Sequence, residues 1–278
     1  MANNLLKFTK MHGLGNDFAV FDAISQKIEF STQVIQMLAD RHFGIGFDQL
    51  LTIEPGQAGV SDFHYRIFNA DGSESGQCGN GVRCVARFLI EKKLTDKKNL
   101  KLSAKAGIME IEVNDFENIR VNMGLPLLEP HQIPMEMPYR ATQYVLSLFE
   151  TEQKIMAVSM GNPHAVIRVD TIETAPVATL GERIGHHAAF PERTNVEFMQ
   201  IMSRNKIKLR VYERGAGETL ACGTGACAAV VAGIINQWLD NQVDVELPGG
   251  TLKIEWQGVG HPVMMTGPAV TVYEGVIR

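Results

Sequence analysis

The sequence predicts an α+β fold built from two similar domains. A glycine-rich stretch at 69–84, NADGSESGQCGNGVRC, recurs at 213–228 as ERGAGETLACGTGACA, which places Cys78 and Cys222 at equivalent positions 144 residues apart. A strand pattern precedes each stretch, and a helical pattern and then a hairpin pattern follow it. The 278 residues, 45% of them hydrophobic, suffice for two separate cores. We therefore predict two pseudo-symmetric domains that arose by duplication of a unit of about 120 residues or more.

Each predicted element has a counterpart in the other half. Apolar residues alternate in both strands, as expected for half-buried strands. The helical patterns follow each cysteine, and the hairpins turn at a glycine. The matched segments are the strands 62–69 and 206–213, the helices 82–94 and 226–239, and the hairpins 100–113 and 243–256, with turns near 106–107 and 249–250.

Proline marks the predicted boundary between the halves. Four prolines fall between 126 and 138, which predicts a linker. The last segment, 269–278, alternates like a strand and is expected to return to the first domain. The predicted domains are residues 1–122 with 268–278, and residues 123–267.

Charge and hydropathy restrict the function. The formal net charge is −5 without a block of like charges, which argues against nucleic acid as a partner. No apolar run reaches the roughly 18 residues that span a bilayer, and the N-terminal residues lack the apolar core of a signal peptide. We expect a cytoplasmic protein without membrane contacts, in which the four cysteines are free thiols.

Cys78 and Cys222 each stand where a glycine-rich loop ends and a helix begins. The free N–H groups and the dipole of a first helical turn can hold a carboxylate, and they can lower a thiol pKa from about 8.5. A tight turn with a small buried side chain and a disulfide are the alternatives for each cysteine. A zinc site is disfavoured because no histidine pair lies at ligand spacing. Cys84 and Cys227 fall inside the helical patterns and are predicted to be packing residues.

Two equivalent thiols suit the inversion of a carbon stereocentre. A thiolate on one face of the carbon removes the proton, and a thiol on the other face returns one. A duplicated protein supplies such a pair naturally, whereas nucleophilic catalysis needs only one thiol.

The chain resembles the diaminopimelate epimerase family over nearly its whole length. The motifs that carry the resemblance are MHGLGNDF, GIGFDQLL, NADGSE, CGNGVRC, MGNPHAV, TNVEF and ERGAGETLACGTGACA. Gln77 stands where methionine is expected and Phe47 where a small residue is expected, and both changes could alter packing beside the cleft.

The resemblance implies that each domain is a mixed β-sheet wrapped around a central α-helix. It also implies a homodimer with Tyr273 near the interface, and an isomerase that converts LL-2,6-diaminopimelate to the meso isomer for lysine and peptidoglycan precursor synthesis. Neither pyridoxal phosphate, another cofactor nor a metal is implied, and the only other partner is the small-molecule substrate.

The resemblance also assigns residues. Cys78 and Cys222 become the acid/base pair, with His164 and Glu213 tuning their pKa values. Amides suit a zwitterionic substrate because they both donate and accept, and Arg214 can grip a carboxylate with two bonds. The substrate-binding residues implied are Asn16, Gln49, Asn69, Gly79, Asn80, Asn162, Asn195, Glu213, Arg214, Gly223 and Thr224.

Three other functions compete with this one. A racemase or isomerase of another amino acid could share the fold, for example a proline or hydroxyproline racemase or a phenazine-biosynthesis isomerase. A cysteine acyltransferase or amidohydrolase would leave the second thiol unexplained. A binding module for amino acids would need neither of the two thiols. Exchange of the hydrogen at carbon 2 of LL-diaminopimelate in heavy water would separate these classes.

Overall fold

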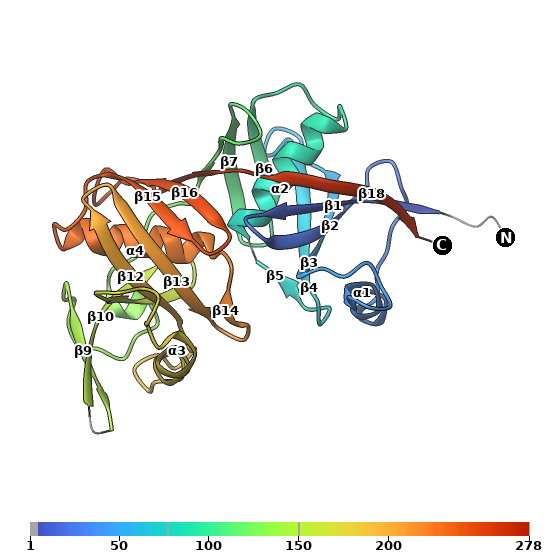
Figure 1. Cartoon of the computed structure of the whole chain (residues 1–278). Helices are drawn as coiled ribbons and strands as arrows, with labels where there is room; N and C mark the ends of the chain where they lie inside the picture. The colour runs from blue at the N-terminus through green and yellow to red at the C-terminus, as the bar shows by residue number, and fades with distance from the viewer. Residues whose placement is uncertain (1–4, 77, 150, 278) are drawn as a thin grey trace. The chain divides into compact units, whose positions relative to one another are not determined.

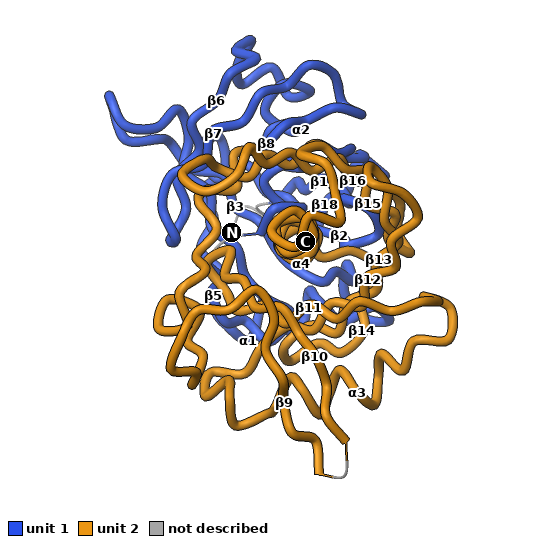
Figure 2. The backbone as a smooth tube through the Cα atoms, turned by 90° about the vertical axis from the view of Figure 1, so that its left-hand side faces the viewer, with its two compact units in different colours: residues 1–121, 267–278 blue, residues 122–266 orange. Residues whose placement is uncertain are grey.

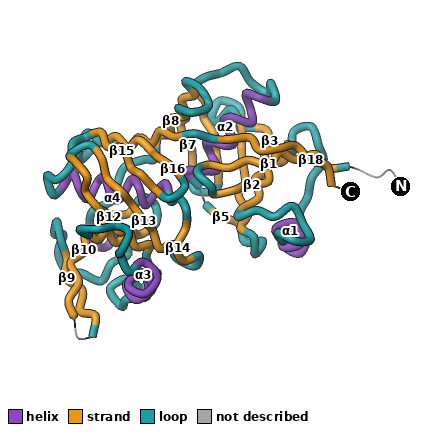
Figure 3. The backbone as a smooth tube through the Cα atoms, viewed as in Figure 1, coloured by secondary structure: helices purple, strands orange, loops and turns teal. Residues whose placement is uncertain are grey.

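The protein is seen here in a computed structural model that describes residues 5–76, 78–149 and 151–277. Backbone contacts divide the chain into two compact units (Figure 2). Unit 1 comprises residues 1–121 and 267–278, and unit 2 comprises residues 122–266. Both units combine strands with helices (Figure 3), so the predicted α+β class is confirmed.

Unit 1 is a mixed sheet with two helices. The strands lie in the order β18-β1-β2-β3-β4-β6-β7-β8, with the short β5 paired to the end of β4. The β2–β3 and β4–β6 pairs are parallel, and the others are antiparallel. The elements are β1 (Leu6–Gly13), β2 (Asn16–Asp22), α1 (Thr32–Ala39), β3 (Gln49–Pro55), β4 (Phe63–Asn69), β5 (Glu74–Ser75), α2 (Gly79–Glu91), β6 (Asn99–Ala104), β7 (Gly107–Val113), β8 (Ile119–Asn122) and β18 (Val270–Ile277).

Unit 2 repeats this topology, as the sequence predicts. Its order is β9-β10-β11-β12-β13-β15-β16-β17, with β14 on β13 and parallel pairs at β11–β12 and β13–β15. The elements are η1 (Pro130–Gln132), β9 (Tyr144–Leu148), β10 (Thr151–Ser159), β11 (Pro163–Arg168), α3 (Val177–Gly185), β12 (Asn195–Ser203), β13 (Lys206–Glu213), β14 (Gly217–Thr219), α4 (Gly223–Ile235), β15 (Gln242–Leu247), β16 (Gly250–Glu255) and β17 (Met264–Gly267).

One long helix forms the centre of each unit. In unit 2, α4 lies against β10, β11, β12 and β16 (Figure 1). Residues Gly225–Gly233 of α4 are all buried, as expected of a helix that is apolar on every side. In unit 1, α2 buries Arg83 completely. Its guanidinium donates to the carbonyl oxygens of Pro268 at 3.0 Å and Gly79 at 3.1 Å, which ties the returning C-terminal segment to the start of the helix.

The predicted return of the C-terminus is confirmed, but the predicted linker is wrong. Strand β18 pairs along β1, from Leu6 opposite Ile277 to His12 opposite Val270. The proline-rich segment, in contrast, packs into unit 2, where Ile133 and Met135 belong to the hydrophobic core. Proline prevents regular hydrogen bonding but does not require exposure, so the segment forms η1 and irregular, partly buried structure instead of a tether.

Of the two positions that depart from the family pattern, Phe47 is buried in the core of unit 1 with Phe8 and Phe21. Gln77 lies outside the described residues. No helix in the described part of the chain is long and apolar enough to cross a membrane.

Candidate active site

Both repeated cysteines are helix N-caps. Cys78 precedes α2 with φ −146° and ψ 114°, and Cys222 precedes α4 with φ −120° and ψ 108°. The Cys78 sulfur accepts a hydrogen bond from the Gly81 N–H at 3.3 Å. Such extended backbone angles are usual at an N-cap, and they turn each thiol toward the free N–H groups of the first helical turn.

The third residue of α4 has no room for a larger side chain, whereas the third residue of α2 has room for a Cβ atom. A Cβ atom at Gly225 would lie 2.8 Å from the Glu197 carboxylate oxygen Oε1 and 3.3 Å from the Cys222 sulfur. The equivalent atom at Gly81 would lie 3.4 Å from the Phe18 ring. Gly225 therefore lets the start of α4 lie directly on the strand that carries Glu197.

An uncharged amide contacts Cys78. Its thiol donates to the Asn16 oxygen Oδ1 at 3.7 Å, and Asn80 donates to the same oxygen at 3.3 Å. The Asn16 nitrogen donates to Asp48 at 3.0 Å, and because a carboxylate accepts only, this bond fixes which end of the amide faces the thiol. Arg83 donates to the other end of the Asn80 amide at 3.0 Å.

Asn16 is held by Asp48, which belongs to a network of charged side chains. Asp17 lies 2.6 Å from Lys10 and 2.8 Å from Arg41, and Arg41 also bridges to Asp48 at 2.8 Å. Burial acts to raise the pKa of Asp17, but hydrogen bonds and charge from Arg41 and Lys10 outweigh it and hold that pKa well below its usual range. Asp17 is therefore ionised at neutral pH and keeps the two cations in place.

Two further predicted residues of unit 1 face each other across β3 and β4. Gln49 stands opposite Asn69, and its amide nitrogen donates to the Asn69 side-chain oxygen at 2.9 Å. Asn69 in turn donates to Ser73 at 3.0 Å. Gln49 is also aligned with Phe18 on the parallel strand β2, so these amides lie at the end of the sheet where β2 and β3 begin.

Acidic groups surround Cys222. The thiol is 3.5 Å from the Thr224 hydroxyl and is hydrogen-bonded to Glu213. Burial, together with the charges of Glu213 and Glu197, raises the pKa of Cys222 well above that of an ordinary thiol, although Thr224 acts in the opposite direction. The predicted lowering of the pKa by the helix N-terminus is thus wrong for Cys222, because desolvation and two carboxylates outweigh the helix dipole.

Glu213 ends β13 beside this thiol. Burial raises the pKa of Glu213, while hydrogen bonds from Thr219 and Cys222 act to lower it. A carboxyl group that both touches a thiol and holds protons more tightly than usual is suited to exchange a proton with that thiol.

His164 and Asn162 connect the loop before β11 to the start of α4. The His164 ring nitrogen Nε2 lies 3.0 Å from the Asn162 oxygen, and Nδ1 lies 2.6 Å from the Glu197 carboxylate. The Asn162 nitrogen donates to the Thr224 hydroxyl at 3.5 Å. A chain of hydrogen bonds therefore runs from Glu197 to the hydroxyl beside the Cys222 thiol.

Asn195 and Arg214 form a separate pair in unit 2. The Asn195 oxygen accepts the backbone N–H of Arg214 at 2.8 Å. One guanidinium nitrogen of Arg214 donates to the backbone oxygen of Glu192 at 2.8 Å. Asn195 is the first residue of β12, so this bond fixes its side chain at the start of that strand.

The structure therefore groups the predicted residues within each unit. Cys78, Asn16 and Asn80 are directly linked to one another, and so are Gln49 and Asn69. In unit 2 one group holds five predicted residues: Cys222, Glu213, Thr224, Asn162 and His164. Gly79 and Gly223 are the buried first residues of α2 and α4.

The sequence reasoning missed Glu197 and Asp48. Both lie inside quoted motifs, but neither stands beside a cysteine in the chain. Glu197 could have been found because it occupies the position that matches the apolar Leu51 of the first repeat.

The remaining cysteines are packing residues inside the helices. Cys84 and Cys227 are completely buried, and burial raises the pKa of Cys84 to about 12. Within the described residues, none of the four cysteines forms a disulfide. No group of three or more metal-binding side chains occurs within 5–76, 78–149 and 151–277.

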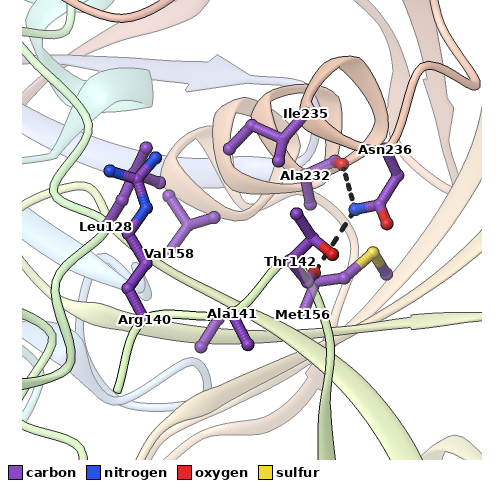
Figure 4. Close-up of a pocket in the computed structure, with 10 residues that line it drawn as sticks. Leu128, Arg140, Ala141, Thr142, Met156, Val158, Ala232, Ile235 and Asn236 are labelled. Carbon is purple, nitrogen blue, oxygen red and sulfur yellow. Dashed lines mark hydrogen bonds between the residues drawn. The ribbon is translucent and has the colours of Figure 1, made fainter.

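A small pocket in unit 2 lies away from the thiol. It has a volume of about 40 Å³ and is lined by Ala232, Ile235 and Asn236 at the end of α4 (Figure 4). Asn236 donates there to the carbonyl oxygens of Ala232 at 2.9 Å and Thr142 at 3.4 Å. Because α4 rises by 1.5 Å per residue, this pocket is about 18 Å along the helix from Cys222.

Comparison with known proteins identifies the relatives of the chain. The family model for diaminopimelate epimerase matches residues 8–128 and 156–272. The diaminopimelate epimerase of Stutzerimonas stutzeri (strain A1501) is 55% identical over 274 residues, covering 99% of both chains. That of Pseudomonas fluorescens (strain Pf0-1) is likewise 55% identical with 99% of both chains covered.

Solved structures share the fold at much lower identity. A hydroxyproline epimerase from Agrobacterium vitis aligns with a TM-score of 0.73 at 14% identity, covering 99% of this chain and 93% of that one. A PhzF-family phenazine biosynthesis protein from Bacillus anthracis gives 0.68 at 16% identity, covering 99% of each. These similarities show the fold alone, which several of the rival functions would share.

Asp17→Asn should destabilise the protein by about 3 kcal/mol at pH 7, because it leaves two cations without their shared carboxylate. A carboxyl group with a depressed pKa contributes stability that is complete above its unfolded-state pKa of about 4 and is lost at lower pH. The difference in thermal midpoint between wild type and variant should therefore shrink as the pH falls below about 4.

The exposed pair of Arg204 and Asp240 provides the control for this prediction. Its side chains are 62% and 51% exposed, so Asp240→Asn should change stability by no more than about 1 kcal/mol. An Asp17→Asn effect as small as this control would contradict the supporting role of the network.

Proposed function

This chain belongs to the diaminopimelate epimerase family, and we propose that it converts LL-2,6-diaminopimelate into the meso isomer. The observation that carries the proposal is the 55% identity over 99% of both chains to a diaminopimelate epimerase. The ranges that match the family model, 8–128 and 156–272, contain both N-cap cysteines. The reaction inverts one carbon stereocentre and makes the protein an isomerase that would serve lysine and peptidoglycan precursor synthesis.

The proposed chemistry is a proton transfer between two thiols through the substrate. A thiolate removes the α-proton from one face, and the second thiol donates a proton to the other face. The carbon–hydrogen bond that breaks is replaced by a new one of opposite configuration, and the thiols exchange protonation states. The N–H groups at the start of α2 and α4 are proposed to bind the reacting carboxylate and to stabilise the charge that develops on it.

Cys222 is proposed to rest as the protonated thiol. Its raised pKa, caused by burial and by the nearby carboxylates, supports this assignment. Glu213 is hydrogen-bonded to it and would accept its proton when Cys222 must act as the base. Cys78, whose thiol donates to a neutral amide, is the proposed base in the opposite direction.

The amides and Arg214 are proposed to bind the rest of the substrate. Diaminopimelate carries two ammonium and two carboxylate groups, which match the donors and acceptors of the asparagine and glutamine side chains. We assign this role to Asn16, Gln49, Asn69, Asn80, Asn162, Asn195, Glu213, Arg214 and Thr224, with Gly79 and Gly223 contributing backbone N–H groups.

Cys78→Ala and Cys222→Ala should each abolish epimerisation, because inversion needs a proton carrier on both faces. Positioned proton transfer is worth about 10² to 10⁴ in rate, so the loss should be at least of that order. Chiral chromatography of the meso isomer formed from the LL isomer measures this loss of activity.

Cys84→Ala and Cys227→Ala are controls that should keep most activity, with a cavity cost of about 1–2 kcal/mol at most. A strong loss in only one of Cys78→Ala and Cys222→Ala would argue for a one-base mechanism.

We propose that neither pyridoxal phosphate nor a metal takes part. The two thiols and the helix N-termini supply the groups that proton transfer requires. Purified protein should show no pyridoxal absorbance, and dialysis against a chelator should leave activity intact; loss that is restored by a divalent metal would overturn this proposal.

We also propose that the protein works in the cytoplasm as a homodimer that assembles through β18. Among the described strand pairings β18 pairs with β1 alone, which leaves its other edge open. Three apolar side chains of this strand are exposed: Val272 by 54%, Tyr273 by 46% and Val276 by 54%. The Tyr273 ring packs edge-on against Phe8, with the ring centres 6.0 Å apart, so its position on the surface is well defined.

Tyr273→Ala should weaken this dimer, because it removes the largest exposed apolar side chain of the strand. Sedimentation velocity of wild type and variant over a range of concentrations tests the effect. Tyr139→Ala, at a residue that is 80% exposed in unit 2, is the control and should sediment like wild type. A wild type that is monomeric at all concentrations would contradict the proposed dimer.

A further inference from the structure

The two repeats differ at the residues directly beneath the catalytic helices. His164 is aligned with Asn195 across β11 and β12, as Phe18 is aligned with Gln49 across β2 and β3. The repeat therefore places His164 at the position of Phe18, and Glu197 at the position of Leu51. All four side chains are completely buried. One repeat thus has an apolar pair where the other has a histidine and a glutamate.

This buried polar pair is costly to the fold. The Glu197 oxygen Oε1 meets His164 at 2.6 Å, but Oε2 has no hydrogen-bond partner among the residues that the structure describes. Burial raises the pKa of Glu197, although His164 acts to lower it. Replacing a buried ionic pair by apolar side chains of similar size is often neutral or stabilising. Because Phe18 and Leu51 fill the equivalent space without polar atoms, packing alone does not explain the pair.

The pair faces the Cys222 thiol by two routes. The direct route is through space at Gly225. A Cβ atom at this glycine would lie 2.8 Å from Oε1 of Glu197 and 3.3 Å from the Cys222 sulfur, so the carboxylate and the thiol face the same small gap. Indirectly, His164 contacts Asn162 at 3.0 Å, and Asn162 donates at 3.5 Å to Thr224, whose hydroxyl lies 3.5 Å from the thiol. Beneath α2, the equivalent Cβ position meets the Phe18 ring and Leu51 instead.

We propose that Glu197 is a positioning residue that fixes His164 and Asn162 and makes Cys222 a chemically different proton carrier from Cys78. The proposal rests on the proposed function, since it assigns a role in that reaction. Glu197 holds Nδ1 of His164, so the ring presents Nε2 to Asn162. Its charge beside α4 keeps the proton on Cys222 until Glu213 or the substrate takes it.

The described groups that face Glu197 come from three elements. His164 projects from β11, Glu213 from the end of β13, and Cys222 from the start of α4. Glu213 remains beside Cys222 when Glu197 is replaced, so the thiol keeps one carboxylate neighbour. Removing the charge of Glu197 should therefore lower the pH at which Cys222 ionises without bringing it to the value of an exposed cysteine.

Two variants test the proposal. Glu197→Gln keeps the shape of the side chain but removes its charge. The double variant His164→Phe with Glu197→Leu installs the apolar pair of the first repeat. Pulsed alkylation with iodoacetamide over a range of pH, followed by peptide mapping, gives the labelling midpoint of Cys78 and Cys222 separately and needs no substrate.

We expect the midpoint of Cys222 to fall in both variants while that of Cys78 stays unchanged. At a fixed pH below the midpoint, each unit of fall raises the labelling rate of Cys222 about tenfold. We also expect kcat to fall at least tenfold with a smaller change in KM, and the alkaline limb of the pH profile of kcat to move. The double variant should melt no lower than Glu197→Gln, because it removes the buried polar pair, and the only hydrogen bond that it takes from a described neighbour is that of His164 with the Asn162 oxygen.

Glu246→Gln on β15 is the matched control, since this glutamate is half-exposed and pairs with Lys206 on the surface of the same unit. It should leave labelling, kcat and stability unchanged. The proposal is overturned if the labelling midpoint of Cys222 stays constant or rises in Glu197→Gln. It is also overturned if the midpoint of Cys78 shifts by the same amount. If the double variant does not fold, Glu197→Gln alone decides. If Cys222 labelling shifts as expected but the wild type does not epimerise diaminopimelate, the proposed function fails while the control of Cys222 by Glu197 stands.

Discussion

The close packing of a helix start against the sheet beneath it determines the rest of each unit. At α4 this contact leaves no room for a side chain at Gly225, because the Glu197 carboxylate occupies the space where a Cβ atom would stand. The cysteine immediately before such a helix has a fixed backbone conformation and lies between the first helical N–H groups and the strand ends. Asn16 at the start of β2 and Glu213 at the end of β13 bring polar side chains from strand ends to the two thiols. A loose helix start would separate the thiol from all of these partners at once.

Duplication supplies two such helix starts, but the sequence then makes them chemically different. Cys78 donates to a neutral amide whose orientation depends on Asp48, and Asp48 is itself held by Arg41. Cys222 lies against Glu213 and near Glu197, with burial adding to the cost of ionisation. The proposed mechanism requires one thiol charged and the other neutral at the start of each turnover. The surroundings of Cys222 favour its neutral state, a bias that the first repeat does not copy at Phe18 and Leu51.

Much of the fold could be predicted because its signals are local and periodic. Alternation identified β4 and β13, the apolar pattern after each cysteine identified α2 and α4, and the glycine turns identified both hairpins. The repeat supplied the shared topology. The proline-rich segment was misassigned because composition shows where regular structure ends but does not show whether Ile133 and Met135 are buried. That depends on tertiary packing, which no local pattern records.

The electrostatics of the site were harder to predict than its residues. The helix N-terminus and the cysteine were visible in the sequence, but the sign of the Cys222 pKa shift depends on carboxylates that are distant in the chain. Glu213 lies nine residues before the thiol and Glu197 lies farther still, and β-sheet pairing brings both beside it. Glu197 has one signal in the sequence: it is a charged residue at the position that matches the apolar Leu51 of the first repeat. Comparing the polarity of equivalent repeat positions is therefore more informative than matching identical residues.

The two cysteines are proposed to act on opposite faces of one carbon. The most direct measurement follows the first few per cent of reaction of LL-diaminopimelate in heavy water and compares deuterium at carbon 2 in the meso product and in the remaining substrate. With two separate proton carriers, the solvent-derived deuterium on the acid thiol enters the product, and the substrate pool stays unlabelled at first. Deuterium that appears in the LL isomer as early as in the meso isomer would show that one group serves both faces, and it would contradict the account.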